Sequence, residues 1–328
     1  MPGVGAKADS SNGSETEIWM NQMLPDLMKK EDEPLFALGH QTLSSGLQSF
    51  SQSIDSFFTH PRMDVESNGT RLRINGTSQY INKESERYNF SVNFSLDLPR
   101  TKKRLNLIFL SISEDLTQEE TGEVGGASSP ENSVQEQDYF AGLRLFIERN
   151  KNINISADYG VKLVMPLDPF ARIRARESVF FGDWELRFTE NLFWFESRGQ
   201  GARLNIDFDK KIRKGLLFRQ ANRGSWLKQE GVVDYAHSLN LFHSLSKKAG
   251  WVYSTGLNSR STRNPYAASY FVSARYRRSI YRNALFAEVQ PFGNWSRDRN
   301  FGFQAGIEFR IQILFGPKYM RPTERPLE

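Results

Sequence analysis

The sequence predicts an all-β fold: a transmembrane antiparallel up-and-down β-barrel of about fourteen strands, preceded by a short N-terminal helical segment. First, apolar and polar residues alternate along most of the chain after residue 62, as in strands with one apolar face. Second, the alternating stretches are about twice as long as the ~5–6 residues of an average strand. Third, no stretch approaches the ~18 apolar residues of a membrane-spanning helix, and mean hydropathy is −0.55.

The first 62 residues follow a different pattern. Residues 1–17 are mostly small or polar, which predicts disorder. Residues 18–62 are amphipathic, and apolar residues at alternating spacings of four and three predict a helix that ends before Pro61. This helix stripe comprises Leu43, Leu47, Phe50, Ile54 and Phe57. Its apolar side needs cover from the inside of the barrel, as a plug, from the membrane interface or from a partner protein.

The last strand is the clearest. Between residues 300 and 315, every odd position from Phe301 onward is apolar, and even positions from Gly302 to Gln312 are polar or glycine. At ~3.3 Å per residue this stretch crosses a bilayer even when tilted. A soluble β-sandwich would also alternate, but long strands that follow one another as hairpins favour the barrel.

The same alternation predicts fourteen strands within a barrel at residues 69–316. They lie at 70–81, 87–99, 103–114, 138–148, 152–166, 169–180, 183–196, 201–209, 215–227, 231–244, 249–259, 266–278, 283–295 and 300–315. Twelve strands are the alternative count. Glu177 and Glu190 fall on the apolar faces of the sixth and seventh stretches, which suggests a bulge there, and the ninth stretch is irregular.

The last strand also carries a recognisable pattern: a polar residue, a glycine two positions later, and then aromatic and apolar residues at alternate positions. Its members are Gln304, Gly306, Phe309, Ile311 and Phe315. This pattern resembles the final-strand signal that the bacterial barrel-assembly machinery recognises. The chain therefore resembles outer-membrane β-barrel proteins of the porin-like class, although thirteen residues (316–328) follow where the family usually ends.

The resemblance implies a Gram-negative outer membrane, with lipids, lipopolysaccharide and, during biogenesis, the assembly machinery as contacts. It also implies a secretion signal removed before Met1, because the first residues lack a basic start and an apolar core. Residues 317–328 would then form a periplasmic tail.

If the first strand runs outward, acidic residues gather in an outer connection and basic residues in the connections on the periplasmic side. The longest connection, residues 114–138, contains eight acidic residues and no Lys or Arg, which places it outside. Only the turn at 182–183 breaks the pattern on the opposite, periplasmic side. The basic connections there are 100–104, 149–151, 210–214, 247–248 and 277–282.

Alternation also directs a set of charged residues into the barrel. The arginines are Arg71, Arg73, Arg144, Arg172, Arg174, Arg176, Arg187, Arg203, Arg275, Arg277 and Arg310, and the carboxylates are Asp97, Asp158, Glu185, Asp207, Asp234, Glu288 and Glu308. Rings of arginine select anions in channels. Arginine–carboxylate pairs alternatively fill and rigidify a barrel, so the sequence leaves both interpretations open.

Inward-facing aromatic residues need a separate explanation. They are Phe140, Phe146, Phe193, Phe271, Phe286 and Phe292. They would line an apolar conduit for a hydrophobic substrate or pack on an inserted N-terminal helix.

Several functions have little support. The absence of cysteine excludes disulfides and thiol chemistry, and four scattered histidines form no metal cluster, so we expect neither metal nor cofactor. His237 and Ser238 are neighbours in a strand and therefore face opposite sides, which disfavours a nucleophile–base pair. The basic stretches lie on separate hairpins without an aromatic platform, so no nucleic acid is expected.

We therefore expect a passive pore or channel for small solutes, with a bias toward anions. The alternative is a closed barrel with a structural, assembly or export role that docks a periplasmic partner through its N-terminal segment and basic turns. A lipid-modifying enzyme is less favoured. A monomer is expected, because no strand shows an obvious polar or small-residue seam.

Overall fold

The computed structural model describes residues 57–58, 70–82, 84, 86–98, 104–113, 137–150, 152–229, 231–261, 265–281 and 284–316. The strands are β1 (Arg71–Ile81), β2 (Arg87–Asp97), β3 (Leu105–Ser113), β4 (Gln137–Arg149), β5 (Ile153–Lys162), β6 (Asp168–Phe181), β7 (Trp184–Phe195), β8 (Gly199–Arg213), β9 (Leu216–Leu227), β10 (Val232–Ser246), β11 (Ala249–Ser261), β12 (Pro265–Tyr281), β13 (Leu285–Ser296) and β14 (Phe303–Phe315), with a 3₁₀ helix η2 (Arg297–Arg299) before β14.

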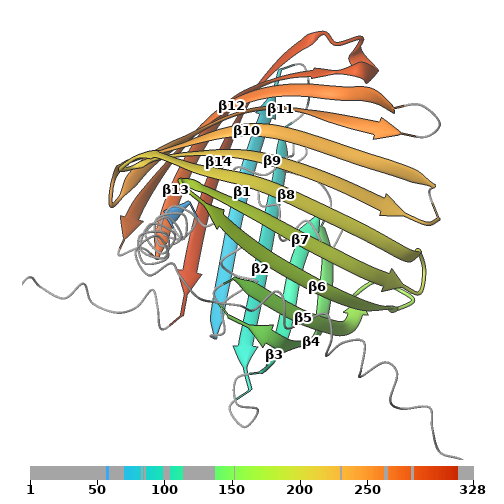
Figure 1. Cartoon of the computed structure of the whole chain (residues 1–328). Coiled ribbons are helices and arrows are strands. Elements are labelled where there is room, and N and C mark those ends of the chain that lie inside the picture. The colour runs from blue at the N-terminus through green and yellow to red at the C-terminus, as the bar shows by residue number, and fades with distance from the viewer. Residues whose placement is uncertain are drawn as a thin grey trace, which may run out of the picture. The chain divides into compact units, whose positions relative to one another are not determined.

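These fourteen strands form one closed barrel (Figure 1). Each strand pairs antiparallel with its neighbour in sequence, and β14 pairs with β1 from Leu72 opposite Phe315 to Ile81 opposite Gly306. Closure removes the exposed edges that an open sheet would present. The fold prediction is thus confirmed with fourteen strands rather than twelve. None of the helices in the described part of the chain is long and apolar enough to cross a membrane.

The predicted bulge between the sixth and seventh strands is wrong. The β6–β7 register is continuous, and Glu177 and Glu190 both lie on the outer face of the wall. Register shifts occur elsewhere, for example between Phe146 and Glu148 in β4.

Several predicted strand limits also change. β5 ends at Lys162 rather than residue 166, while β8 extends to Arg213, so most of its predicted basic connection is strand and the turn is Lys214–Gly215. β12 runs to Tyr281 rather than to residue 278, so Arg277 and Arg278 lie within the strand and not in the predicted basic connection at 277–282. Hydrogen bonds to neighbouring strands prolong β8 and β12 beyond the point where the alternation in sequence becomes irregular.

We name the two ends of the barrel by their connections. The turn end carries the short turns Gly182–Asp183, Lys214–Gly215 and Lys247–Lys248, and the loop end carries the connections between β3 and β4 and between β5 and β6. The helix-stripe residues before Phe57, the acidic connection at 114–136 and the tail at 317–328 lie outside the described residues.

The two faces of the wall differ in chemistry. In β14, Phe303, Phe309 and Ile311 are exposed on the outer face, whereas Gln304 and Arg310 on the inner face are buried. An apolar exterior around a polar interior is the reverse of a water-soluble barrel and matches a wall surrounded by lipid. The sequence alternation therefore separates a lipid face from a lumen face.

Inward phenylalanines lie flat over glycines of the adjacent strand. Phe292 of β13 pairs with Gly306 of β14, and a Cβ added to Gly306 would lie 2.3 Å from the Phe292 Cζ atom. Only glycine leaves room for the ring at that distance. The same arrangement joins Phe170 to Gly160, Phe193 to Gly201 and Phe271 to Gly256. These rings therefore cover the wall rather than project across the lumen.

Candidate functional site: the arginine-lined lumen

The structure places the predicted lumen arginines on the inner face of the wall. Arg71 is partly exposed, and the others are buried: Arg73, Arg144, Arg172, Arg174, Arg176, Arg187, Arg203, Arg275, Arg277 and Arg310. The carboxylates Glu288 and Glu308 are buried beside them. Their two-residue spacing along each strand puts all of these side chains on the inner face. Most of them form two clusters, one on β12–β14 and one on β4–β7.

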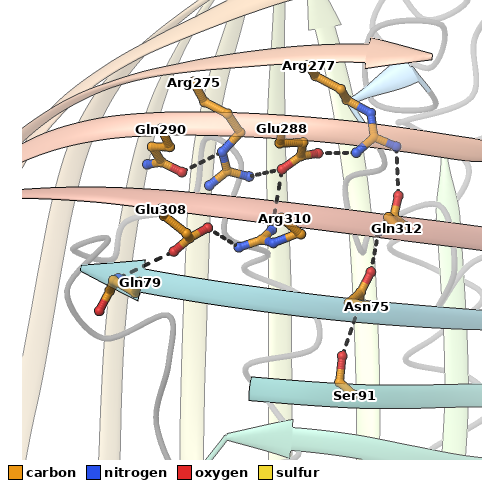
Figure 2. A network of polar contacts seen from close by, with 10 residues as sticks. All are labelled: Asn75, Gln79, Ser91, Arg275, Arg277, Glu288, Gln290, Glu308, Arg310 and Gln312. Carbon is orange, nitrogen blue, oxygen red and sulfur yellow. Dashed lines mark hydrogen bonds and ion pairs between the residues drawn. The ribbon is translucent and has the colours of Figure 1, made fainter. Parts of the chain in front are cut away.

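The first cluster spans the closure between β14 and β1 and is shown in Figure 2. Its centre is Glu288 of β13, which forms an ion pair with Arg277 and lies 3.6 Å from both Arg275 Nη1 and Arg310 Nη1. A second carboxylate, Glu308, accepts from Arg310 at 2.6 Å. Three guanidinium groups thus share one buried carboxylate.

A chain of side-chain hydrogen bonds continues around the wall from this centre. Arg277 donates to Gln312 Oε1 at 2.7 Å, and Gln312 donates to Asn75 Oδ1 at 2.7 Å. Asn75 then donates to Ser91 Oγ at 2.9 Å. These contacts connect β12 with β14, β1 and β2, so the lumen network crosses the junction of the first and last strands (Figure 2). Such a network fixes the position of the charged groups as well as the closure.

The second cluster lies on β4–β7. Asp158 is clamped between Arg144, which donates to it at 2.8 and 3.0 Å, and Arg172, whose Nε donates to it at 3.0 Å. The next two inward arginines of β6 have neutral residues directly across the sheet: Ser156 and Asn191 flank Arg174, and Asn154 and Thr189 flank Arg176. Three arginines thus follow one another at two-residue intervals on the inner face of β6.

Sequence analysis missed one buried ion pair. Arg219 of β9 donates to both oxygens of Asp209 of β8 at 2.6 Å, and its guanidinium lies 5.1 Å from the centre of the Phe242 ring. The predicted eighth strand ends at residue 209, and the irregular pattern of the predicted ninth strand leaves the facing of Arg219 undefined. Its alternation with inward Leu217 and Ala221 would have identified it.

The lumen carries an excess of positive charge. Among the described residues, eleven arginines and seven carboxylates are buried, which leaves an excess of four positive charges. Two of the carboxylates, Asp168 and Asp209, were not predicted. By contrast, the predicted Asp234 lies near the loop end, where its pair with Arg260 is about half exposed. Low-dielectric walls focus the field of such an excess into the lumen.

Two aromatic clusters flank the charged zones. Near the loop end, Phe140, Phe170, Phe193 and Phe195 contact one another, with Phe140 and Phe170 centroids 5.6 Å apart. Near the turn end, Phe58 is fully buried against Leu217, Phe242 and Val252. Neither Phe170 nor Phe195 was predicted as inward-facing.

Phe57 and Phe58 lie inside the barrel near its turn end. Phe57 contacts Phe286 with a centroid distance of 6.3 Å, and the Phe58 ring lies 5.6 Å from that of Phe242. Of the helix stripe, Phe57 alone is described, and Leu43, Leu47, Phe50 and Ile54 lie outside the described residues.

The assembly-signal residues divide between the two faces of β14. Gln304 points inward, Gly306 lies beneath the Phe292 ring, and the apolar members Phe309, Ile311 and Phe315 are exposed on the outer face. The glycine of the pattern thus has a local steric reason in this chain. Separately, His237 lies on the outer face while Ser238 is buried on the inner face, as expected for strand neighbours.

No protein-family model and no curated protein matches the sequence. Solved structures resemble the chain at low similarity. OmpTdeltaL8, a loop-deletion mutant of the Vibrio cholerae outer membrane protein OmpT, is 8% identical with a TM-score of 0.47 and covers 76% of this chain and 100% of its own. OprB of Pseudomonas putida is 8% identical with a TM-score of 0.47, covering 79% and 97%.

The outer membrane channel DcaP of Acinetobacter baumannii is 7% identical with a TM-score of 0.43, covering 75% of this chain and 96% of its own. Similarity at this level contributes no functional argument. The chain's own geometry defines its class: a closed barrel of fourteen antiparallel strands, apolar outside and charged inside, is an outer-membrane β-barrel protein of a Gram-negative bacterium.

Proposed function

We propose that this barrel is a passive channel for small solutes that conducts anions better than cations. The excess of four positive charges among the described buried residues carries this proposal. Arginine-lined constrictions select anions because fixed guanidinium charge attracts them and repels cations. Ion pairs and hydrogen bonds hold the arginines near the wall, and several inward phenylalanines lie flat over glycines. Both features favour side chains that line an open lumen over side chains that fill it.

Single-channel recording in planar bilayers tests the proposal. The Arg174→Gln/Arg176→Gln variant removes two of the eleven buried arginine charges, both from the inner face of β6. We expect its ratio of chloride to potassium permeability to fall markedly toward one. Lys247→Gln/Lys248→Gln is the matched control, since it removes the same charge from a turn outside the lumen. An equal change in both variants would contradict a lumen-based selectivity.

One observation favours a second candidate, a closed barrel with a structural or export role. Phe58 is fully buried inside the turn end, against Leu217, Phe242 and Val252, at a place where a side chain reduces the open cross-section. In that case the full-length protein passes no current and retains a periplasmic protein on purification only while residues 18–60 are present. Absence of current from the full-length protein and from a folded variant lacking residues 1–62 would refute the channel.

We further propose a non-enzymatic role. His237 and Ser238 face opposite sides of the wall, which separates a base from a nucleophile that would need to lie ~3 Å away. Phospholipid hydrolysis by the purified protein that is lost on His237→Ala would overturn this assignment.

A further inference from the structure

One connection at the loop end of the barrel is entirely apolar. Between β5 and β6, residues Leu163, Val164, Met165, Pro166 and Leu167 follow one another without a polar side chain, and all five are exposed. Met165 is 92% exposed and Leu167 is 55% exposed. We name residues 163–167 the apolar tip. Single exposed apolar side chains are ordinary on a protein surface, but a contiguous group of them indicates contact with another apolar surface.

Four other hairpins become polar as they leave the wall at the loop end. Each carries an outward aromatic residue near the end of its first strand, and these are Tyr80 in β1, Trp194 in β7, Trp226 in β9 and Trp295 in β13. Two positions further along the chain lie the exposed polar residues Asn82, Glu196, Lys228 and Arg297. Because a belt of aromatic residues marks the boundary of the apolar membrane region, these four hairpins reach water directly after it.

The β5–β6 hairpin stays apolar beyond its aromatic residue. Tyr159 of β5 is 68% exposed on the outer face, and the outward positions after it are Val161 and Leu163. The Leu163 amide donates to the Tyr139 carbonyl at 2.7 Å, which extends the β4–β5 pairing and keeps the Leu163 side chain on the outer face. Tyr139 is itself an outward aromatic residue of β4. The apolar tip therefore begins beside the aromatic belt and continues the lipid-facing wall.

Polar contacts hold both ends of the apolar tip, on the side of the lumen. Lys162, directly before the tip, forms an ion pair with Asp138 at 2.7 Å. Asp168, directly after it, accepts hydrogen bonds from the amide and the hydroxyl of Ser197 at 2.9 and 2.5 Å. Lys162 lies opposite both Asp168 and the inward-facing Phe140 across the sheet. The polar ends of the loop thus face inward, whereas its first apolar side chain, Leu163, faces outward.

This arrangement favours lipid over a solute or a protein as the partner of the apolar tip. An apolar solute on its way into the lumen would meet the charged side of the hairpin first. A protein partner needs about 800 Å² on each side of a standard interface, which is more than five side chains of this size provide. Lipid requires no separate interface, because the tip is continuous with a wall that faces lipid. Short turns, as at the opposite end of the barrel, are typical of the periplasmic side, so the tip faces the outer leaflet.

We propose that the apolar tip is embedded in the outer leaflet, where Leu163, Met165 and Leu167 contact acyl chains at the boundary with the lipid headgroups. The β5–β6 hairpin is then a lipid anchor, whereas the hairpins that carry Asn82, Glu196, Lys228 and Arg297 lie in water. Burial of apolar side chains at this boundary is the same interaction that holds interfacial segments on a membrane. It keeps the hairpin at the rim, so the hairpin does not fold across the mouth of the barrel.

Site-directed spin labelling of the full-length protein in vesicles of phosphatidylcholine and phosphatidylglycerol tests the proposal, and the chain contains no cysteine to interfere. We expect a nitroxide on Met165→Cys to collide several-fold more often with dissolved oxygen, which concentrates in lipid, than with a water-soluble nickel chelate. A nitroxide on Leu167→Cys should behave in the same way. Lys228→Cys is the matched control, because it is an exposed position on the β9–β10 hairpin, and the opposite preference is expected there.

Two outcomes would overturn the proposal in variants whose folding is verified by heat-modifiable migration on gels. If the label at residue 165 collides with the nickel chelate as often as the label at residue 228, the apolar tip lies in water. The same result is expected if the tip needs a protein partner, since the vesicles contain no other protein. If the label at residue 165 collides rarely with both reagents, protein rather than lipid covers the tip. The measurement is independent of ion selectivity, because the labelled positions lie outside the lumen.

Discussion

The strongest stability prediction concerns Glu288. Its side chain is 3% exposed and is shared by Arg277, Arg275 and Arg310, with distances of 3.6 Å to the last two. Glu288→Gln keeps the shape of the side chain but removes the charge that balances three neighbouring guanidinium groups. Removing one partner of a buried ion pair typically costs about 3–5 kcal/mol. We expect the free energy of unfolding to fall by about that amount.

Asp234→Asn is the control, because it also removes one carboxylate from an arginine pair. The Asp234 and Arg260 side chains are 47% and 46% exposed, and exposed pairs contribute about 0–1 kcal/mol. Both variants can be unfolded with urea in lipid vesicles and followed by the fluorescence of the six tryptophans. Equal losses of stability would refute the argument that the buried charge cluster on β12, β13 and β14 stabilises the barrel.

The remaining predictions concern packing. Gly306→Ala places a Cβ 2.3 Å from the Phe292 Cζ atom, so it should destabilise the barrel by about 1–3 kcal/mol. The double variant Gly306→Ala/Phe292→Ala should lose less than the sum of the two single variants in the same unfolding assay; additive losses would contradict the contact. Gly250→Ala places a Cβ 2.6 Å from the Phe58 Cζ atom and should displace the Phe58 ring together with the neighbouring residue 57. A thiol introduced as Phe57→Cys should therefore react faster with a water-soluble maleimide when Gly250→Ala is present than when it is absent. Gly76→Ala, with no atom within 4 Å of the added Cβ, should leave that rate unchanged.

The strands and the identity of the two faces could be predicted from sequence because a strand has a side-chain period of two. In β14 or β6, the parity of one residue determines which arginines face inward. The fourteen-fold count followed from the same rule once Glu177 and Glu190 were accepted as outward-facing. Alternation predicts which face of the wall a residue lies on, but it does not predict which residues of the adjacent strands lie beside it.

Cross-strand relations needed the register. The phenylalanine–glycine pairs and the Arg277–Gln312–Asn75–Ser91 chain join residues that are 8 to 237 positions apart. No local pattern encodes such pairings. The Arg219–Asp209 pair is missed for a simpler reason: Asp209 is the last residue of the predicted eighth strand, and the irregular pattern of the ninth leaves the facing of Arg219 undefined.

The contacts of Phe57 and Phe58 also show that a local sequence pattern does not identify its packing partner. The helix stripe indicated that an apolar surface must cover it, and three surfaces were available in principle. For the last residue of the stripe and its neighbour, the structure shows contacts with Phe242 and Phe286 inside the barrel. That choice depends on the shape of the turn end, which the stripe itself does not contain.

The reversal potential of the full-length protein in a planar bilayer with a tenfold KCl gradient tests the central claim most directly. An excess of lumen arginines makes chloride more permeant than potassium. The reversal potential is therefore expected to shift from zero toward the equilibrium potential of chloride. A potential of zero, or one on the potassium side, would contradict the claim that these arginines line a conducting path.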